Sequence, residues 1–228
     1  MYEILFLDLD DTILDYRRQE RLAVEQTFAH FGVTPTDDLC RQYIAIGDCY
    51  WKMVEQQAEG REELAKRRYT SLLQENNVPA VYSEFAGQYT DFLSTGHFFL
   101  PGAEEAVERL SKKYRLFLAS NGGGKIQAGR LKSANIMRFF ENRFVSELIG
   151  VSKPAAEFFQ RSFAQIPDFD KSKAMMVGDS LTSDMKGGLN AGLTTCWINP
   201  RHLPRDPQIP VDYETESLAQ LEALLETL

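Results

Sequence analysis

Residues 4–12 carry the stretch that decides the fold, Ile4-Leu5-Phe6-Leu7-Asp8-Leu9-Asp10-Asp11-Thr12. Four consecutive apolar residues come directly before a group of acids. A short apolar run without polar alternation is typical of a strand that is buried on both faces in the middle of a parallel sheet. Ligand sites in open α/β sheets lie at the carboxyl ends of the strands. The acids therefore stand where a functional site is expected.

Similar apolar runs recur along the chain and predict further strands. They span residues 116–119, 144–145, 174–177 and 194–198, with a last short strand near 211–213. Helical patterns lie between them, one opening at Pro101-Gly102, others over 155–163 and 185–191, and a last one capped by Ser217. Strands that alternate with helices predict an α/β fold with a doubly wound, Rossmann-like parallel sheet.

One long segment does not alternate in this way. From residue 15 to residue 93 the apolar residues recur at helical spacing, and no convincing strand is present. A helical insertion of this length, directly after the first strand, indicates a separate subdomain. We therefore expect residues 1–14 and 96–228 to form an α/β catalytic core, and residues 15–95 to form a helical domain.

Composition and charge exclude several classes of protein. The chain has 228 residues, of which 43% are hydrophobic and 25% are charged, as in ordinary globular proteins. Its formal net charge of -8 is opposite in sign to that of proteins that bind the nucleic-acid backbone, so no nucleic-acid polymer is expected as a partner. No uncharged stretch approaches the roughly 20 residues that cross a bilayer. The first residues also lack the basic region of a signal peptide.

The three cysteines indicate in which cellular compartment the protein is expected. Cys40, Cys49 and Cys196 are odd in number and form no CxxC pair. We expect free, buried thiols rather than disulfides or a zinc site. Together with the lack of membrane and signal segments, this predicts a cytoplasmic protein.

Two groups of acids follow predicted strands. Asp8 and Asp10 are two residues apart, so an extended backbone would point both side chains to the same side, while Asp11 would lie on the other face as a local cap or a solvated acid. Two carboxylates so close stay ionised together only if a cation shares them, and oxygen ligands suit Mg²⁺. Asp179 and Asp184 follow the run at 174–177 in the same manner.

The two strands between these acids end in different chemistry. Ser120 and Asn121 follow the run at 116–119, and Lys153 comes shortly after the run at 144–145. Four strand ends thus offer an acid pair, a hydroxyl, an ammonium and a second acid pair. A phosphorylated substrate would need such a local positive charge in a chain of net charge -8.

The order of these motifs resembles that of the haloacid dehalogenase superfamily. That superfamily has DxDxT, then a strand ending in Ser or Thr, then Lys before Pro, then GDSxxxD, as in residues 8–12, 116–120, 153–154 and 178–184. The resemblance covers essentially the whole chain, because the helical insertion is similar to the superfamily's cap of the first type. The finer texture around residues 120–122 and 178–188 resembles the bacterial housekeeping pyrimidine 5′-nucleotidases. Ser120 departs from the commoner Thr, and the cap sequence has no residue-by-residue match.

The resemblance implies a Mg²⁺-dependent phosphatase that works through an aspartyl-phosphate. Asp8 would be the nucleophile and Asp10 the general acid–base. The metal would be held by a carboxylate oxygen of Asp8, the backbone carbonyl of Asp10 and Asp179. Asp184 would not bind the metal directly; it would orient a metal-bound water or bond Lys153.

The resemblance also implies how the substrate binds. Ser120 and Lys153 would contact the phosphate oxygens, with help from N–H groups near Asn121. The cap would close over the site, and its aromatic residues could stack on a nucleobase, Tyr16 being the best placed. The same aromatic residues could equally be core of the cap; they are Tyr16, Phe28, Phe31, Tyr43, Tyr50 and Trp51.

Several functions remain open on this sequence. The favoured substrate is a small phosphorylated molecule, most specifically a pyrimidine nucleoside 5′-monophosphate. A phosphosugar or phosphoglycolate phosphatase or a phosphomutase would share the same catalytic set. A dehalogenase would need neither Asp10 nor the metal, so Asp10 and Asp179 argue against it. A non-catalytic binding module on the same fold is the third class. The sequence is compatible with a monomer or a homodimer.

Overall fold

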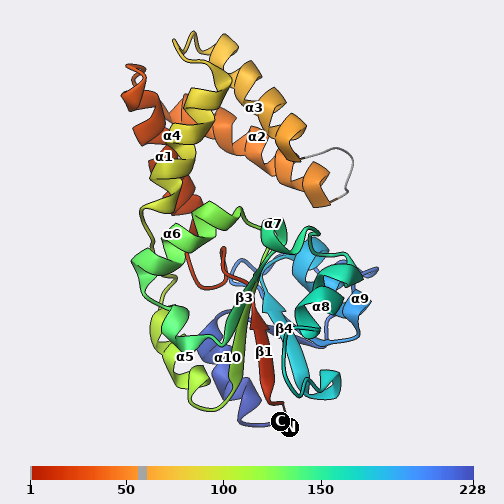
Figure 1. Ribbon diagram of the computed structural model, residues 1–228. Helices are drawn as coiled ribbons and strands as arrows, with labels where there is room; N and C mark the ends of the chain where they lie inside the picture. The colour runs from red at the N-terminus through yellow and green to blue at the C-terminus, as the bar shows by residue number, and fades with distance from the viewer. Residues whose placement is uncertain (1, 56–60) are drawn as a thin grey trace. The chain divides into compact units, whose positions relative to one another are not determined.

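The computed structural model describes residues 2–55 and 61–228, and the chain divides into two compact units. The first unit comprises the residues up to Tyr16 together with His97–Leu228, and the second comprises Arg17–Gly96. Figure 1 shows strands in the first unit and helices in the described part of the second. In the part of the chain that is described, no helix is long and apolar enough to cross a membrane.

The first unit is built on a parallel sheet, as the sequence predicts. Its described strands run in the order β3-β2-β1-β4-β5-β6, and every neighbouring pair is parallel. β1 is therefore central, and its four residues are all buried. The strand bounds are β1 Ile4–Leu7, β2 Arg115–Ser120, β3 Asn142–Val145, β4 Ala174–Gly178, β5 Thr194–Ile198 and β6 Tyr213–Thr215.

The last strand begins two residues later than the sequence predicts. The carboxylate of Asp212 accepts hydrogen bonds from the backbone N–H of Thr195 at 2.8 Å and from its hydroxyl at 2.9 Å. Because this side chain occupies the N–H that a neighbouring strand would use, backbone pairing between β5 and β6 starts only at Tyr213.

Helices cover both faces of the sheet, which makes the fold doubly wound. On one face, alternate strand residues such as Leu5 and Leu7 pack with α5 and α10; on the other, Phe6 and Phe117 pack with α8 (Figure 1). The helical segments are α5 Ala103–Ser111, α6 Gly124–Ala134, η1 Met137–Phe139, α7 Ser146–Ile149, α8 Ala156–Phe163, η2 Lys171–Lys173, η3 Leu181–Met185, α9 Lys186–Ala191 and α10 Leu218–Leu225. The cap of α10 is the predicted one, because Ser217 Oγ accepts from the Gln220 N–H.

The second unit is a bundle of helices with an aromatic core. Its helices are α1 Tyr16–His30, α2 Asp37–Glu55, α3 Arg61–Glu75 and α4 Tyr82–Ser94. Phe28 is fully buried against Phe85, with ring centroids 5.3 Å apart, and Tyr43 is fully buried against Tyr89 at the same distance. Both are core residues, the second of the two interpretations that the sequence allows. The side chains of Tyr50 and Trp51 lie outside the described part of the structure.

The cysteines are free, but they are not all buried. Cys40 and Cys196 are buried, whereas Cys49 is exposed. Cys49 lies two positions after the buried Gly47 on α2. Residues that are two positions apart on an α-helix point to nearly opposite sides, so Cys49 faces away from the core. The expectation of a buried thiol at Cys49 was therefore wrong.

Candidate active site

The site begins at the carboxyl ends of β1 and β4, which lie side by side. Leu7 pairs with Val177, and the Asp8 N–H donates to the Val177 carbonyl at 2.9 Å. Asp8 follows β1 directly and Asp179 follows β4 directly. The parallel register thus brings together two acids that are far apart in the sequence.

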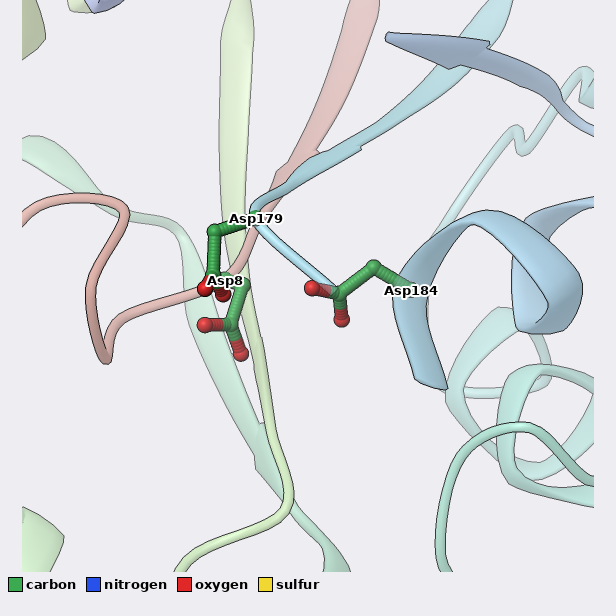
Figure 2. A group of neighbouring side chains, drawn as sticks. All are labelled: Asp8, Asp179 and Asp184. Atoms are coloured by element: carbon green, nitrogen blue, oxygen red, sulfur yellow. The ribbon is translucent and has the colours of Figure 1, made fainter. Parts of the chain in front are cut away.

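Three carboxylates converge at this edge of the sheet. Asp8, Asp179 and Asp184 each offer an oxygen, and these oxygens lie within 4.8 Å of one another. Figure 2 shows the Asp184 carboxylate reaching from the helical segment after β4 toward the other two. Gly178 allows this approach, because a Cβ added there would lie 2.8 Å from Cβ of Asp184 and even nearer to its carboxylate.

Lys153 lies against two members of this group. Its side chain is 1% exposed, and Nζ is 2.7 Å from Asp8 Oδ1 and 2.5 Å from Asp184 Oδ1. The ammonium also donates to the Ala119 carbonyl at the end of β2. All three donors of the ammonium are thereby used, which is what a buried lysine requires.

Asn121 positions this lysine rather than facing the acids. Its side-chain amide donates to the Lys153 carbonyl at 2.8 Å and accepts from the Lys153 N–H at 2.9 Å. The two backbone bonds fix the loop that carries Lys153 to the end of β2. A substrate contact from Asn121 would therefore come from its backbone, as the sequence analysis expects.

The side chain of Asp10 does not join the other acids. Its Oδ1 accepts from Nη1 of Arg130, and its Oδ2 accepts from Nε2 of Gln127 at 2.7 Å. The strand ends at Leu7, and the chain then turns, so the alternation that would have placed Asp8 and Asp10 on one side does not continue. The expectation that one cation is shared by these two side chains was wrong. Whether the backbone carbonyl of Asp10 is a metal ligand stays a prediction.

Ser120 is buried at the end of β2, next to Asp10. Its Oγ accepts from Gln127 Nε2 at 2.9 Å and from the Gly122 N–H at 3.2 Å. Asp11 adopts a left-handed conformation and caps α1, because its Oδ1 accepts from the Tyr16 N–H at 3.0 Å. Asp11 is thus a local cap, the first of the two roles that the sequence allows.

The carboxyl groups of Asp8, Asp179 and Asp184 lie so close together that a bound cation would stabilise their ionised forms. Burial raises the pKa of Asp8 to about 8; Asp184 and Asp10 add to the rise, and Lys153 opposes it. Burial, with the charges of Asp184 and Asp8, also raises the pKa of Asp179 well above its ordinary value. One ammonium does not balance three converging carboxylates. Oxygen donors of this kind, partly buried and close together, fit Mg²⁺.

Sequence analysis missed two residues of this site, Gln127 and Arg130. Both lie on α6 and both are buried, although their side chains are polar. A signal was present, because residues three apart share a face of a helix and this helix follows the strand that ends in Ser120. The sequence predictions, however, include no helix over residues 124–134, where α6 lies.

The chain matches a family model and several known proteins. A family model described as haloacid dehalogenase-like hydrolase matches residues 4–198. The chain belongs to this family. The resemblance found in the motifs is confirmed, and so is the α/β fold with its parallel sheet.

Three relatives that this chain resembles span nearly its whole length. The pyrimidine 5′-nucleotidase PynA of Streptococcus pneumoniae is 34% identical over 96% of this chain and 93% of its own length. The pyrimidine 5′-nucleotidase YjjG of Escherichia coli is 28% identical over 98% of each chain. The HAD-hydrolase YfnB of Bacillus subtilis is 36% identical over 98% of this chain and 95% of its own length.

A solved structure of YfnB shows how far the likeness extends in space. It superposes with a TM-score of 0.92 at 36% identity and covers 98% of both chains. That crystal structure is described as bound to magnesium and as revealing interdomain movement.

Proposed function

We propose that this protein is a Mg²⁺-dependent phosphatase that hydrolyses pyrimidine nucleoside 5′-monophosphates. The observation that carries the proposal is the contact of Lys153 with Asp8 and Asp184 inside a group of three carboxylates. The arrangement offers a nucleophile, oxygen ligands for a cation and a buried positive charge for a phosphate. Two relatives that span the chain are pyrimidine 5′-nucleotidases, which supports the choice of substrate.

In the first half of the proposed reaction, an oxygen of Asp8 attacks the phosphorus of the monoester. A bond forms between this oxygen and phosphorus, and the bond from phosphorus to the nucleoside oxygen breaks. Asp10 gives its proton to the leaving oxygen, so that a neutral alcohol departs. The products of this half are an aspartyl-phosphate and a nucleoside.

In the second half, water attacks the phosphorus of the aspartyl-phosphate. Asp10 accepts a proton from that water, and the bond between phosphorus and the Asp8 oxygen breaks. Inorganic phosphate leaves, and Asp8 is regenerated as a carboxylate. Asp10 thereby regains the proton that it gave in the first half.

The cationic groups carry the charge of the phosphate. Asp8, Asp179 and the Asp10 carbonyl would hold Mg²⁺, whose positive charge offsets the negative charge of phosphate and carboxylates. Asp184 would support this group through Lys153, which it contacts. Ser120 would bind a phosphate oxygen, and Lys153 would bind another by turning to it the N–H that now faces Asp8. Loss of one such stabilising group costs about 2.7–4 kcal/mol of barrier. Tyr16 stays a proposed contact for the nucleoside.

A phosphate-release screen tests this function. The purified protein is offered UMP, dUMP, TMP and a panel of sugar phosphates, once with Mg²⁺ and once with EDTA. We expect release from the pyrimidine nucleotides with Mg²⁺ only, and none from an Asp8→Asn variant that keeps its fold. Turnover of sugar phosphates with the nucleotides ignored would refute the nucleotidase assignment. Full activity of Asp8→Asn would refute the covalent mechanism.

A further inference from the structure

Helix α6 presents two polar side chains to Asp10. Gln127 and Arg130 are three residues apart and so share one face of the helix. Between them they engage both carboxylate oxygens: Arg130 Nη1 donates to Oδ1, and Gln127 Nε2 donates to Oδ2 at 2.7 Å. A carboxylate that is held at both oxygens has a fixed orientation.

The ion pair with Asp10 compensates for the burial of the Arg130 guanidinium. The residue is 0% exposed, and its Nη1 bonds only Asp10 and the Gln127 Oε1, the latter at 3.1 Å, among the described residues. Its Nε and Nη2 are buried and have no hydrogen-bond partner in that part of the chain. Removing a guanidinium from water is costly unless a carboxylate compensates, and Asp10 is the carboxylate it contacts. An arginine that served only packing would be replaced by an apolar side chain at no loss.

Gln127 links the same carboxylate to Ser120. Its Nε2 lies 2.7 Å from Asp10 Oδ2 and 2.9 Å from Ser120 Oγ, while its Oε1 accepts from Arg130. The amide is therefore fully used and cannot rotate without losing a bond. Ser120, the last residue of β2, and Asp10, which lies in the turn after β1, are both held by this one side chain.

The contact also keeps Asp10 apart from the other acids. Asp8, Asp179 and Asp184 already place three carboxylates within 4.8 Å, and a fourth would add repulsion. Arg130 supplies a separate cation for Asp10, as Lys153 does for Asp8. Two aspartates that are two residues apart thus have different partners and can take different roles.

We propose that Arg130, together with Gln127, is a positioning residue that aims the Asp10 carboxyl group for proton transfer to the leaving oxygen in the first half of the reaction and from water in the second. This inference rests on the proposed phosphatase function. The guanidinium exchanges no proton itself, because it stays protonated in proteins. Its effect on proton transfer passes through Asp10, which predicts a distinct kinetic signature.

The signature is a dependence on the leaving group. A nucleoside 5′-oxygen is a poor leaving group and needs a proton, whereas p-nitrophenolate leaves without one. For Arg130→Met, we expect the rate of the first half with UMP, followed as uridine release in a single turnover, to fall by about 100-fold, the scale of general acid catalysis. The same rate with p-nitrophenyl phosphate, followed as release of p-nitrophenolate, should fall less than about threefold, because this leaving group needs no proton. Hydrolysis of the aspartyl-phosphate should slow equally with both substrates, since Asp10 accepts a proton from water in that step.

Four further variants make the experiment decisive. Lys132→Met removes an exposed cation from the same helix and should behave as wild type with both substrates. Arg130→Lys keeps the charge without the fork and should restore part of the UMP activity. Arg130→Met should have no further effect when added to Asp10→Asn, because both act on one step. Gln127→Leu should give a milder form of the same signature, and it serves as the test if Arg130→Met does not fold.

The outcomes separate this inference from the proposed function. Wild-type protein that releases phosphate from no monoester refutes the function, and the inference falls with it. Active wild type with equal losses in the first-half rate on UMP and p-nitrophenyl phosphate in Arg130→Met overturns the inference alone, as does a selective loss that persists in the Asp10→Asn background. If the screen shows a sugar phosphate as the substrate, that alkyl ester replaces UMP in the comparison.

Discussion

Lys153 Nζ lies 2.7 Å from Asp8 Oδ1, although 145 residues separate the two in sequence. The ammonium comes from the loop between α7 and α8, and the carboxylate comes from the end of β1. The strand before α7 is β3, which lies two strands from β1 in the sheet. Asp184 shares the same ammonium at 2.5 Å. The positive charge at the acid group is therefore fixed by contacts that exist only in the folded chain.

Replacing Lys153 by Met tests that contact. We expect the variant to lose nearly all turnover, and we expect its free energy of unfolding to fall by about 3–5 kcal/mol, because two carboxylates are left buried without their cation. Steady-state kinetics and urea unfolding measure the two effects. Lys173→Met is the matched control: this lysine pairs with Glu3 at the surface and should change neither quantity appreciably. A Lys153→Met protein with near-normal turnover would contradict the assigned role.

Gly122→Ala tests the space that Gln127 needs. A Cβ at this position would lie 2.6 Å from Cγ of Gln127 and would displace the amide from Ser120 and Asp10. We expect kcat/KM with UMP to fall by more than about tenfold, since a small displacement of a positioning group is costly in rate. Gly123→Ala is the control, because its Cβ would meet nothing nearer than 3.6 Å. Equal effects of the two substitutions would argue against the role of Gln127.

The buried ion pair of the helical unit predicts a change in stability. Arg68 Nη2 lies 3.5 Å from Glu20 Oε1, and both side chains are less than a tenth exposed. Burial raises the pKa of Glu20, and Arg68 opposes the rise. Arg68→Met should lower the free energy of unfolding by about 3–5 kcal/mol, because it leaves the carboxylate buried without its guanidinium.

A second substitution in the same unit should recover part of that loss. Adding Glu20→Gln to Arg68→Met removes the uncompensated charge, so the double variant should be more stable than Arg68→Met alone at neutral pH. Arg41→Met, which breaks an exposed pair with Asp38, should cost less than about 1 kcal/mol. Urea unfolding of the full chain gives all three values. A double variant less stable than Arg68→Met would contradict this account.

The pKa of Asp8 predicts how metal-free protein responds to pH. Its ordinary value is 3.8, and burial raises the pKa in the folded protein to about 8. The folded state therefore binds this proton more tightly than the unfolded state, so the contribution of Asp8 to stability falls as pH rises between these two values. Mg²⁺ should reverse the trend, because a metal displaces the proton and stabilises the carboxylate.

Thermal unfolding measures this dependence directly. In EDTA, Tm should fall as pH rises through neutral, and saturating Mg²⁺ should raise Tm most at the alkaline end. Asp8→Asn should flatten the decline in EDTA, because it removes the titrating group. A Mg²⁺ effect that is largest at acidic pH would be opposite in sign to this prediction.

Much of the fold could be predicted from local pattern. The runs at 4–7 and 194–198 became strands over the same residues, because β1 is buried at every position and β5 at every position but the first. The last strand was shifted because its start depends on Asp212, a side chain from outside the ladder. A strand boundary that is set by a tertiary contact cannot be predicted from the hydrophobicity pattern of the sequence.

The candidate site divides in the same manner. Position after a strand was enough to predict that Asp8, Asp179 and Lys153 belong to one edge, since parallel strands end together. It was not enough for Asp10, whose side chain is turned by Arg130 and Gln127. Strand alternation was the wrong guide there, because the strand had already ended.

The sequence by itself determined which residue types stand at each strand end, and hence the family and the chemistry available at the sheet edge. Only the tertiary structure decided which ammonium or guanidinium each aspartate meets. The physical reason is range: hydrophobic periodicity acts over a few neighbours in the chain, whereas a buried charge takes its partner from whichever distant segment the packed fold brings within hydrogen-bonding distance.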